Sequence, residues 1–227
     1  MSERICILLR HGDYHQLAHT PSAHQPFPLN ANGQAQAEAG VESVRRLVQQ
    51  QGWSIQPEVH SSILLRAWQT ARIIVDGLPE CERIIETDQL TERCVGSGAN
   101  LTKQQIERVI DQDPRYASLP ANWKSDSQFR LPFVGAESLL DAGRRVADYI
   151  ERTMQRVSGD GQAVLFIGHG ASFRHAAHCL GVLSLDRVSS LSMYHARPVA
   201  LALSADGHWH HAGGDWKPRH AATQYTD

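Results

Sequence analysis

The chain has 227 residues, of which 41% are hydrophobic and 20% are charged, and its formal net charge is −2 at pH 7. This length and apolar content suffice for one globular domain over residues 1–227 with a sizeable core. A nearly neutral chain without runs of like charge lacks the extended basic surface that nucleic acids and anionic membranes require, so we expect neither partner.

The sequence also argues against secretion, membrane insertion and cysteine-based sites. The first apolar run begins at Ile5, too early for a secretory signal, and no stretch approaches the roughly 18 apolar residues of a membrane span. The four cysteines are widely separated and include no Cys-x-x-Cys pair, so we predict neither a zinc ribbon nor a dithiol redox centre. A cytoplasmic protein is the simplest expectation.

The first half of the chain alternates strands and helices. Residues Ile5–Leu9 form a continuous apolar run, typical of a central strand covered on both faces. A proline-containing loop over 13–32 leads into a helix over 33–51, which ends before Gly52. The elements predicted next are a strand at 57–61, a helix at 64–75 and a strand at 84–86.

The second half contains an insertion and then more alternating elements. Residues 96–135 carry a predicted helix near 102–110 followed by three prolines, and this segment is either a lid or a structural excursion without substrate contact. The later elements are a helix at 136–157, a strand at 163–167, a helix at 171–180, strands at 191–194 and 199–203, a turn at Asp206-Gly207 and a loose tail after Gly214. This alternation predicts a mostly parallel sheet with helices on both faces.

Two of the predicted strands run directly into a histidine followed by glycine. Strand 5–9 leads into Arg10-His11-Gly12, and strand 163–167 leads into Gly168-His169-Gly170. Ligands bind at the carboxyl ends of strands in open α/β sheets, so both histidines are expected in one pocket. A neutral imidazole is a nucleophile near pH 7, and a guanidinium fits phosphate oxygens. The combination suits phosphoryl transfer to nitrogen, although a single Arg-His pair is more often ordinary surface.

Two further charged residues are candidates for the same pocket. Arg66 falls in the first turn of helix 64–75, where the helix dipole disfavours a cation unless an anion binds there; an exposed arginine is the alternative. Glu92 follows the third strand and is the best candidate for protonating a leaving alcohol, with Asp13 as the second candidate. The structural alternative for Glu92 is a salt bridge with Arg93.

Several histidines have spacings that resemble metal sites. His175 and His178 are three residues apart, and His208, His210 and His211 are clustered. No matching set of carboxylates or cysteines accompanies them. We therefore expect no metal and no cofactor.

Taken together, the motifs resemble the histidine phosphatase superfamily, in its phosphoglycerate-mutase-like branch. The matching segments occur in family order: Leu9–Gly12, Ser62–Ala71, Leu90-x-Glu92 with Gly96, Gly135–Ser138, and Gly168–Gly170 with Arg174. The resemblance implies a three-layer α/β/α sandwich with a mostly parallel, mixed sheet. It also implies His11 as the phosphorylated nucleophile and Glu92 as the acid and base. The phosphate pocket that it implies consists of Arg10, His11, Arg66, His169 and Gly170.

Departures from the family pattern narrow the expected activity. Acid phosphatases of the other branch carry aspartate where this chain has Gly170, which excludes proton donation from that position. True phosphoglycerate mutases tend to continue with Glu-Ser and a nearby Trp-Asn, whereas this chain has Asp13-Tyr14-His15. We therefore predict a metal-independent phosphomonoesterase. The alternatives are a phosphoglycerate mutase and a non-catalytic module that binds phosphate ligands.

The expected substrate is a small phosphorylated metabolite or a phosphoprotein. Tyr14-His15 and His60-Ser61-Ser62 look like segments of a mutase-like Ser/Thr protein phosphatase, but this likeness does not decide between the two classes. The side chains that either reach over the site or are solvated are Arg93, Arg115, Trp123, Lys124 and Arg130. The sequence makes no prediction of the oligomeric state.

Overall fold

The computed structural model describes residues 3–21 and 24–219. One six-stranded sheet has the strand order β3-β2-β4-β1-β6-β7. These strands are β1 (Glu3–Arg10), β2 (Ser54–Ser62), β3 (Arg83–Thr87), β4 (Gln162–Gly168), β6 (Pro198–Ser204) and β7 (Trp209–Gly214). The four strands from β3 to β1 are parallel, while β6 and β7 are antiparallel to their neighbours, so the sheet is mixed and mostly parallel.

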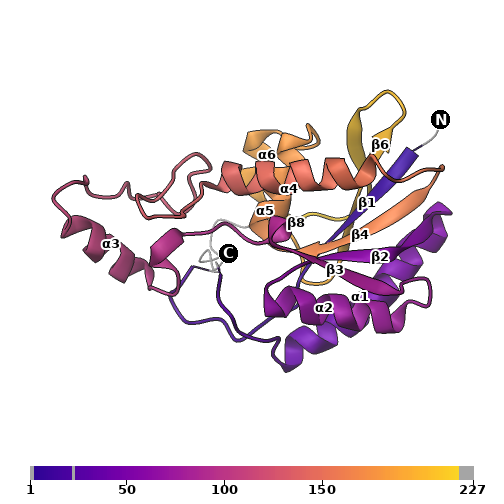
Figure 1. The fold of residues 1–227 in the computed structure, drawn as a ribbon, viewed down its shortest axis with the longest axis horizontal. Coiled ribbons are helices and arrows are strands. Elements are labelled where there is room, and N and C mark those ends of the chain that lie inside the picture. Colours follow the sequence, from indigo (N-terminus) through magenta and orange to yellow (C-terminus); the bar gives the residue numbers. More distant parts are fainter. Residues whose placement is uncertain (1–2, 22–23, 220–227) are drawn as a thin grey trace.

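Helices cover both faces of this sheet. The helices are α1 (Ala31–Gln51), α2 (Leu65–Gly77), α3 (Lys103–Asp111), α4 (Leu139–Met154), α5 (Gly170–Cys179) and α6 (Leu185–Ser190), with 3₁₀ turns η1 (Asp88–Leu90) and η2 (Gly96–Gly98). Figure 1 shows α1 and α2 below the sheet and α4 and α5 above it. The predicted three-layer α/β/α sandwich is therefore confirmed. No helix in the described residues is long and apolar enough to cross a bilayer.

The apolar run of β1 is continuous because both faces of the strand are covered. Ile5, Ile7 and Leu9 pack in the core between the sheet and helices α1 and α2, whereas Cys6 and Leu8 pack in the core between the sheet and helices α4 and α5. All five side chains are fully buried. Burial of each large aliphatic side chain contributes about 1.5–3 kcal/mol, so this strand anchors the sheet and fixes the position of the residues that follow it.

Capping side chains set where the helix before β4 begins. The Ser138 hydroxyl accepts a hydrogen bond from the Asp141 N–H at 3.0 Å, and the Asp141 carboxylate accepts one from the Ser138 N–H at 2.9 Å. These reciprocal bonds satisfy donors that a helix start leaves open. The predicted helix over 136–157 was therefore too long, because α4 begins only at Leu139 and ends at Met154.

The end of the chain also differs from the prediction. Only Leu191–Ser192 of the predicted strand 191–194 is strand β5, and it pairs with β8 (Lys217–Pro218) outside the main sheet. After β5 the chain reaches β1, where the Ala196 N–H donates to the Arg10 carbonyl at 2.8 Å. The loose tail predicted after Gly214 is wrong for β8, and residues 220–227 lie outside the described part.

The insertion over 96–135 contains α3 and an apolar cluster of its own. Trp123 is fully buried and packs in a cluster with Ile106, Ile110 and Leu131, and its indole N–H donates to Glu107 Oε1 at 3.1 Å. The insertion extends away from the sheet, on the side toward which the parallel strands run (Figure 1). That placement puts it beside the strand ends that carry the two histidines, and its role as a lid stays a prediction.

Candidate active site

Parallel pairing of β1 and β4 brings the two histidines together. Arg10 and Gly168 are partners in the register, and the His11 N–H continues the ladder to the Gly168 carbonyl at 2.9 Å. The imidazole rings of His11 and His169 have centroids 5.0 Å apart. Both side chains are buried, with 1% and 0% of their surfaces exposed. The two strand ends thus form one site.

The hydrogen bonds around His11 fix its tautomer. Its Nδ1–H donates to the Gly12 carbonyl at 2.6 Å, so the lone pair is on Nε2. Nε2 accepts a hydrogen bond from Arg66 Nε at 3.2 Å. Burial, followed by the charges of Arg66 and Arg10, lowers the pKa of His11 well below its usual value near 6.5. His11 is therefore a neutral imidazole whose unprotonated Nε2 faces a guanidinium.

Arg66 joins the two histidines from the first turn of α2. Its Nη2 donates to His169 Nδ1 at 3.3 Å, and its Nη1 donates to the Gln25 carbonyl at 2.8 Å. The Tyr14 ring lies 4.5 Å from the guanidinium carbon, a cation–π contact. No side chain caps the start of α2, and its first turn holds no acidic residue. The structure thus places a fully buried cation at a helix N-terminus, a combination that favours a bound anion.

His169 is held in the opposite tautomer. Its Nδ1 accepts from Arg66, and its Nε2–H donates to the Ser62 hydroxyl at 2.9 Å. Burial, followed by the charge of Arg66, lowers the pKa of His169 well below 6.5. Both imidazoles are thus neutral at pH 7, and Arg66 lies buried between them.

Arg10 lies beside this pair, and its position explains a glycine. Its Nη1 donates to the Met193 carbonyl at 3.2 Å. A Cβ atom at Gly170 would lie 3.2 Å from Arg10 Cδ, so the side chain of Arg10 packs against the first residue of α5. Glycine at position 170 leaves room for this close approach.

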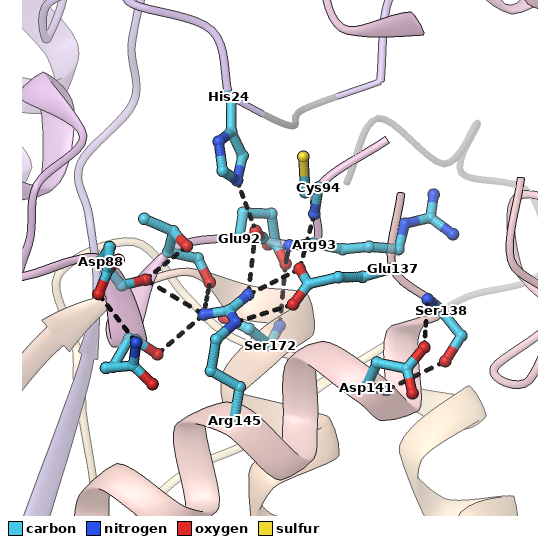
Figure 2. Close-up of polar contacts among 12 residues, drawn as sticks. His24, Asp88, Glu92, Arg93, Cys94, Glu137, Ser138, Asp141, Arg145 and Ser172 are labelled. Carbon is cyan, nitrogen blue, oxygen red and sulfur yellow. Dashed lines mark hydrogen bonds and ion pairs between the residues drawn. The ribbon is translucent and has the colours of Figure 1, made fainter. Parts of the chain in front are cut away.

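Glu92 is anchored at the N-terminus of α5. Its Oε1 accepts from the Arg93 and Ser172 N–H groups at 2.9 and 3.0 Å, and its Oε2 accepts from the Ala171 N–H at 3.2 Å. His169 provides no side-chain cap to α5, so Glu92 takes that role. Figure 2 shows Glu92 directed toward Ser172, while the guanidinium of Arg93 points elsewhere. The alternative role of Glu92, a salt bridge with Arg93, is not what these contacts show.

An ion pair holds the segment that carries Glu92. The Arg145 guanidinium binds both oxygens of Glu137 at 2.8 Å, and its Nη1 donates to the Gln89 carbonyl at 2.8 Å and the Thr91 carbonyl at 3.2 Å (Figure 2). Glu137 also accepts from the Cys94 N–H at 3.0 Å. The backbone on both sides of Glu92 is therefore tied to the start of α4.

Asp13, the second candidate acid, is engaged elsewhere. Its carboxylate accepts from the side-chain amides of Asn30 and Asn32 at 3.0 and 3.3 Å and from the Tyr14 N–H at 3.0 Å. Burial raises the pKa of Asp13, but these hydrogen bonds outweigh it and the net shift is downward. The carboxylate secures the entry to α1, where Asn30 is the N-cap.

A large pocket opens beside Glu92. Its volume is about 1060 Å³, and it lies between the loop after β1, the insertion and α5. Its charged lining residues are Glu92, Arg93, Lys103, Lys124, Arg174 and Arg219. Five of these six are cationic, so the pocket favours anionic ligands.

The five side chains proposed to reach over the site have different positions. Arg93 and Lys124 line the pocket, and Trp123 belongs to the core of the insertion. Arg115 pairs with Asp113, and Arg130 pairs with Asp141, each at 2.6 Å. Only two of the five are thus positioned to meet a ligand there.

The histidines considered as metal ligands make local hydrogen bonds. His175 donates from Nδ1 to the Ala171 carbonyl at 2.7 Å, and its Nε2 lies 3.0 Å from the Ser127 hydroxyl. His178 Nδ1 donates to the Leu183 carbonyl at 2.8 Å. Within residues 3–21 and 24–219, no three His, Cys, Asp or Glu side chains are grouped as a metal site.

Several contacts of the site were not predicted from the sequence. Ser62 and Tyr14 lie in motifs noted above, but no contact with His169 or Arg66 was predicted for them. Gln25 and His195 reach the site from loops, whose paths are not set by a repeating pattern. Arg145 lies in α4, and nothing in the sequence links it to Glu92.

The strand ends of this mixed α/β sheet place two neutral histidines on either side of a buried arginine, and a large cation-lined pocket opens beside Glu92. This arrangement is suited to binding a phosphoryl group. The sequence matches the profile of the histidine phosphatase superfamily (branch 1) over residues 6–212, and the chain belongs to this family.

Similar proteins fall into two functional groups. A 2,3-bisphosphoglycerate-dependent phosphoglycerate mutase of Parvibaculum lavamentivorans is 28% identical over 149 residues, which cover 65% of this chain and 68% of that protein. The protein of the same name from Methylobacterium radiotolerans is 28% identical over 208 residues, or 90% of this chain and 92% of that one. The solved structure of a mycobacterial glucosyl-3-phosphoglycerate phosphatase with VO3 has a TM-score of 0.67 and 22% identity, covering 95% and 98% of the two chains.

Proposed function

We propose that this protein is a phosphomonoesterase that forms a phosphohistidine on His11. The observation that carries the proposal is the position of His11 Nε2, which holds a lone pair 3.2 Å from a buried guanidinium nitrogen. A nucleophile and a preorganised cation are thus directed at one point. Positioning and electrostatic stabilisation account for most of the catalysis of phosphoryl transfer, and this site supplies both.

Substrate binding replaces hydrogen bonds within the site. A phosphoryl group beside His11 accepts the N–H groups that Arg66 otherwise donates to His11 and His169, while Arg10, the residue before His11, adds a second positive charge. This exchange frees the lone pair of His11 Nε2 for attack. Two guanidinium groups then neutralise the phosphoryl oxygens, and no metal ion is required for that purpose.

The reaction follows in two displacements. His11 Nε2 forms a bond to phosphorus in line with the departing oxygen, and Glu92 gives that oxygen a proton so that it leaves as an alcohol. Water then attacks the phosphohistidine and gives a proton to Glu92, which releases inorganic phosphate and restores His11. The position of Glu92, on the wall of the pocket and at the start of α5, suits both proton transfers.

The pocket supports a small phosphorylated metabolite with a second anionic group as substrate. Arg93 has only 7% of its surface exposed. The nearby carboxylates of Glu92 and Glu137 partly offset the effect of burial, which lowers the pKa of Arg93, and an anion in the pocket would add to that compensation. Arg93→Gln is expected to raise KM for such substrates and to leave KM for p-nitrophenyl phosphate nearly unchanged.

A phosphoglycerate mutase is the second candidate, favoured by the names of the relatives and by the basic pocket. The size of the pocket favours hydrolysis, because about 1060 Å³ accommodates a drug-sized molecule and leaves space for water beside a smaller one. A mutase must instead keep water away from its phosphohistidine. Incubation with 3-phosphoglycerate and 2,3-bisphosphoglycerate tests this candidate directly.

The deciding experiment compares the natural protein with His11→Ala. We expect p-nitrophenyl phosphate hydrolysis without added metal, acid-labile labelling by phosphate, and loss of both in the variant. Retained phosphate binding without turnover in the natural protein would instead indicate a binding module. A screen of phosphorylated metabolites and phosphopeptides then identifies the preferred substrate.

A further inference from the structure

The regular pairing of β1 with β6 stops just before His11. Leu9 pairs with Pro198, the first residue of β6, and proline has no N–H to donate. The next two carbonyls, of Arg10 and His11, accept hydrogen bonds from the segment before β6. The Ala196 N–H donates to the Arg10 carbonyl at 2.8 Å, and His195 Nδ1–H donates to the His11 carbonyl at 2.7 Å. A side chain thus does here what a backbone donor does along the rest of the ladder.

The turn that presents His195 is unusual and tightly held. Ala196 has φ of 51°, in the left-handed region that residues other than glycine seldom adopt. Helix α1 packs directly on this turn, because a Cβ atom at Gly40 would lie 2.7 Å from the Ala196 carbonyl oxygen. An uncommon backbone conformation held by its surroundings is a feature that occurs at functional sites.

The bond from His195 is one half of a clamp on a single peptide group. The carbonyl of the His11–Gly12 peptide accepts from His195, and the N–H of the same peptide donates to the Thr70 hydroxyl at 3.1 Å. Thr70 in turn donates to the Arg66 carbonyl at 2.8 Å. The orientation of this peptide is therefore fixed from both sides.

That peptide controls the tautomer of His11. The Gly12 carbonyl, which accepts from His11 Nδ1 at 2.6 Å, follows directly after the clamped peptide. Rotation of the peptide would move this acceptor away from Nδ1, and the proton would then no longer be confined to that nitrogen. The lone pair on Nε2, and its direction toward Arg66, depend on the clamp.

We propose that His195 is a positioning residue for His11: by donating to the His11 carbonyl it holds the peptide that keeps the lone pair on Nε2. The kinetic part of this inference rests on the proposed function, whereas the structural part does not. The essential property is a donor at the position of Nδ1, and an aromatic ring alone is insufficient.

Three substitutions separate the donor from the ring. Asparagine places an amide N–H near the position of Nδ1, phenylalanine keeps a ring without a donor, and aspartate has the shape of asparagine without the N–H. We expect His195→Asn to retain kcat within about threefold. His195→Phe and His195→Asp should lower kcat by about 10- to 100-fold, the range for small misplacements of reacting groups, with KM changed by less than about twofold.

Imidazole nitrogen NMR provides a readout that does not require turnover. In the natural protein and His195→Asn, His11 should show a protonated Nδ1 and an unprotonated Nε2, whereas the other two variants should show a mixture of tautomers. A His195→Phe protein with full kcat and an unchanged His11 spectrum would overturn the proposal, as would an asparagine variant as impaired as the phenylalanine one. If the phenylalanine variant does not fold, the comparison of asparagine with aspartate decides. Absence of phosphatase activity in the natural protein would refute the proposed function and leave the NMR test intact.

Discussion

Replacement of Glu92 by glutamine separates its two roles, as a helix cap and as a proton donor. Glutamine keeps one oxygen, which is able to accept from the Arg93 and Ser172 N–H groups, but its NH₂ then faces the Ala171 N–H. One unsatisfied buried donor costs about 1–3 kcal/mol of stability. The lost proton donor affects only leaving groups that depart as alcohols, and general acid catalysis contributes about 10²- to 10⁴-fold.

The assay compares an alkyl phosphate with p-nitrophenyl phosphate, whose phenolate departs without protonation. We expect kcat/KM for the alkyl ester to fall by about 10²- to 10⁴-fold, or about 3–5 kcal/mol in the barrier, and that for the aryl ester to fall by less than about tenfold. Glu137→Gln is the matched control. It weakens the pairing with Arg145 that holds the same segment, so it should lower stability and affect both esters equally. Equal losses for Glu92→Gln on the two esters would refute the assignment of Glu92 as the acid.

Three further predictions concern the surroundings of the site. Ser62→Ala leaves the Nε2–H of His169 without its acceptor, and we expect about 1–3 kcal/mol lower stability in urea unfolding together with reduced kcat; an unchanged midpoint would contradict this role. Gly143→Ala would place a methyl group 2.5 Å from His175 Cβ, where α4 packs on α5, and should cost about 1–3 kcal/mol; full thermal stability would show that the two helices separate readily. Burial lowers the pKa of His175 to about 4, so the unfolded chain takes up a proton near pH 6.5 while the folded protein does not. Stability should therefore fall between about pH 6.5 and 4, by up to about 1.4 kcal/mol per pH unit from this residue, and His175→Gln should remove that part of the slope in unfolding titrations.

The sequence was informative wherever a repeating pattern controls the structure. The apolar run Ile5–Leu9 predicted a central strand, and its parallel pairing with β4 places His11 and His169 next to each other, with ring centroids 5.0 Å apart. A cation in the first turn of a helix is unfavourable without an anion, which pointed to Arg66, and in the structure Arg66 donates to both imidazoles.

Contacts that depend on loop paths and tertiary packing could not be derived in the same way. The pairing of β5 with β8 involves two residues from each segment, too few to give a periodic signal. Asp13 and Glu92 are both carboxylates close to strand ends. Only the structure distinguishes them. Side-chain amides hold Asp13 at the start of α1, whereas N–H groups of α5 hold Glu92 on the wall of the pocket.

The bond from Arg66 to His11 Nε2 has a consequence for the protein when no substrate is present. While the guanidinium N–H occupies the lone pair, the imidazole is shielded against electrophiles that bring no oxyanion, such as acylating and alkylating reagents. In the proposed reaction, an oxyanion accepts the same N–H groups and so exposes the lone pair only when a phosphorylated reactant is bound. One guanidinium would then both hold the phosphoryl group and keep the nucleophilic nitrogen covered in its absence.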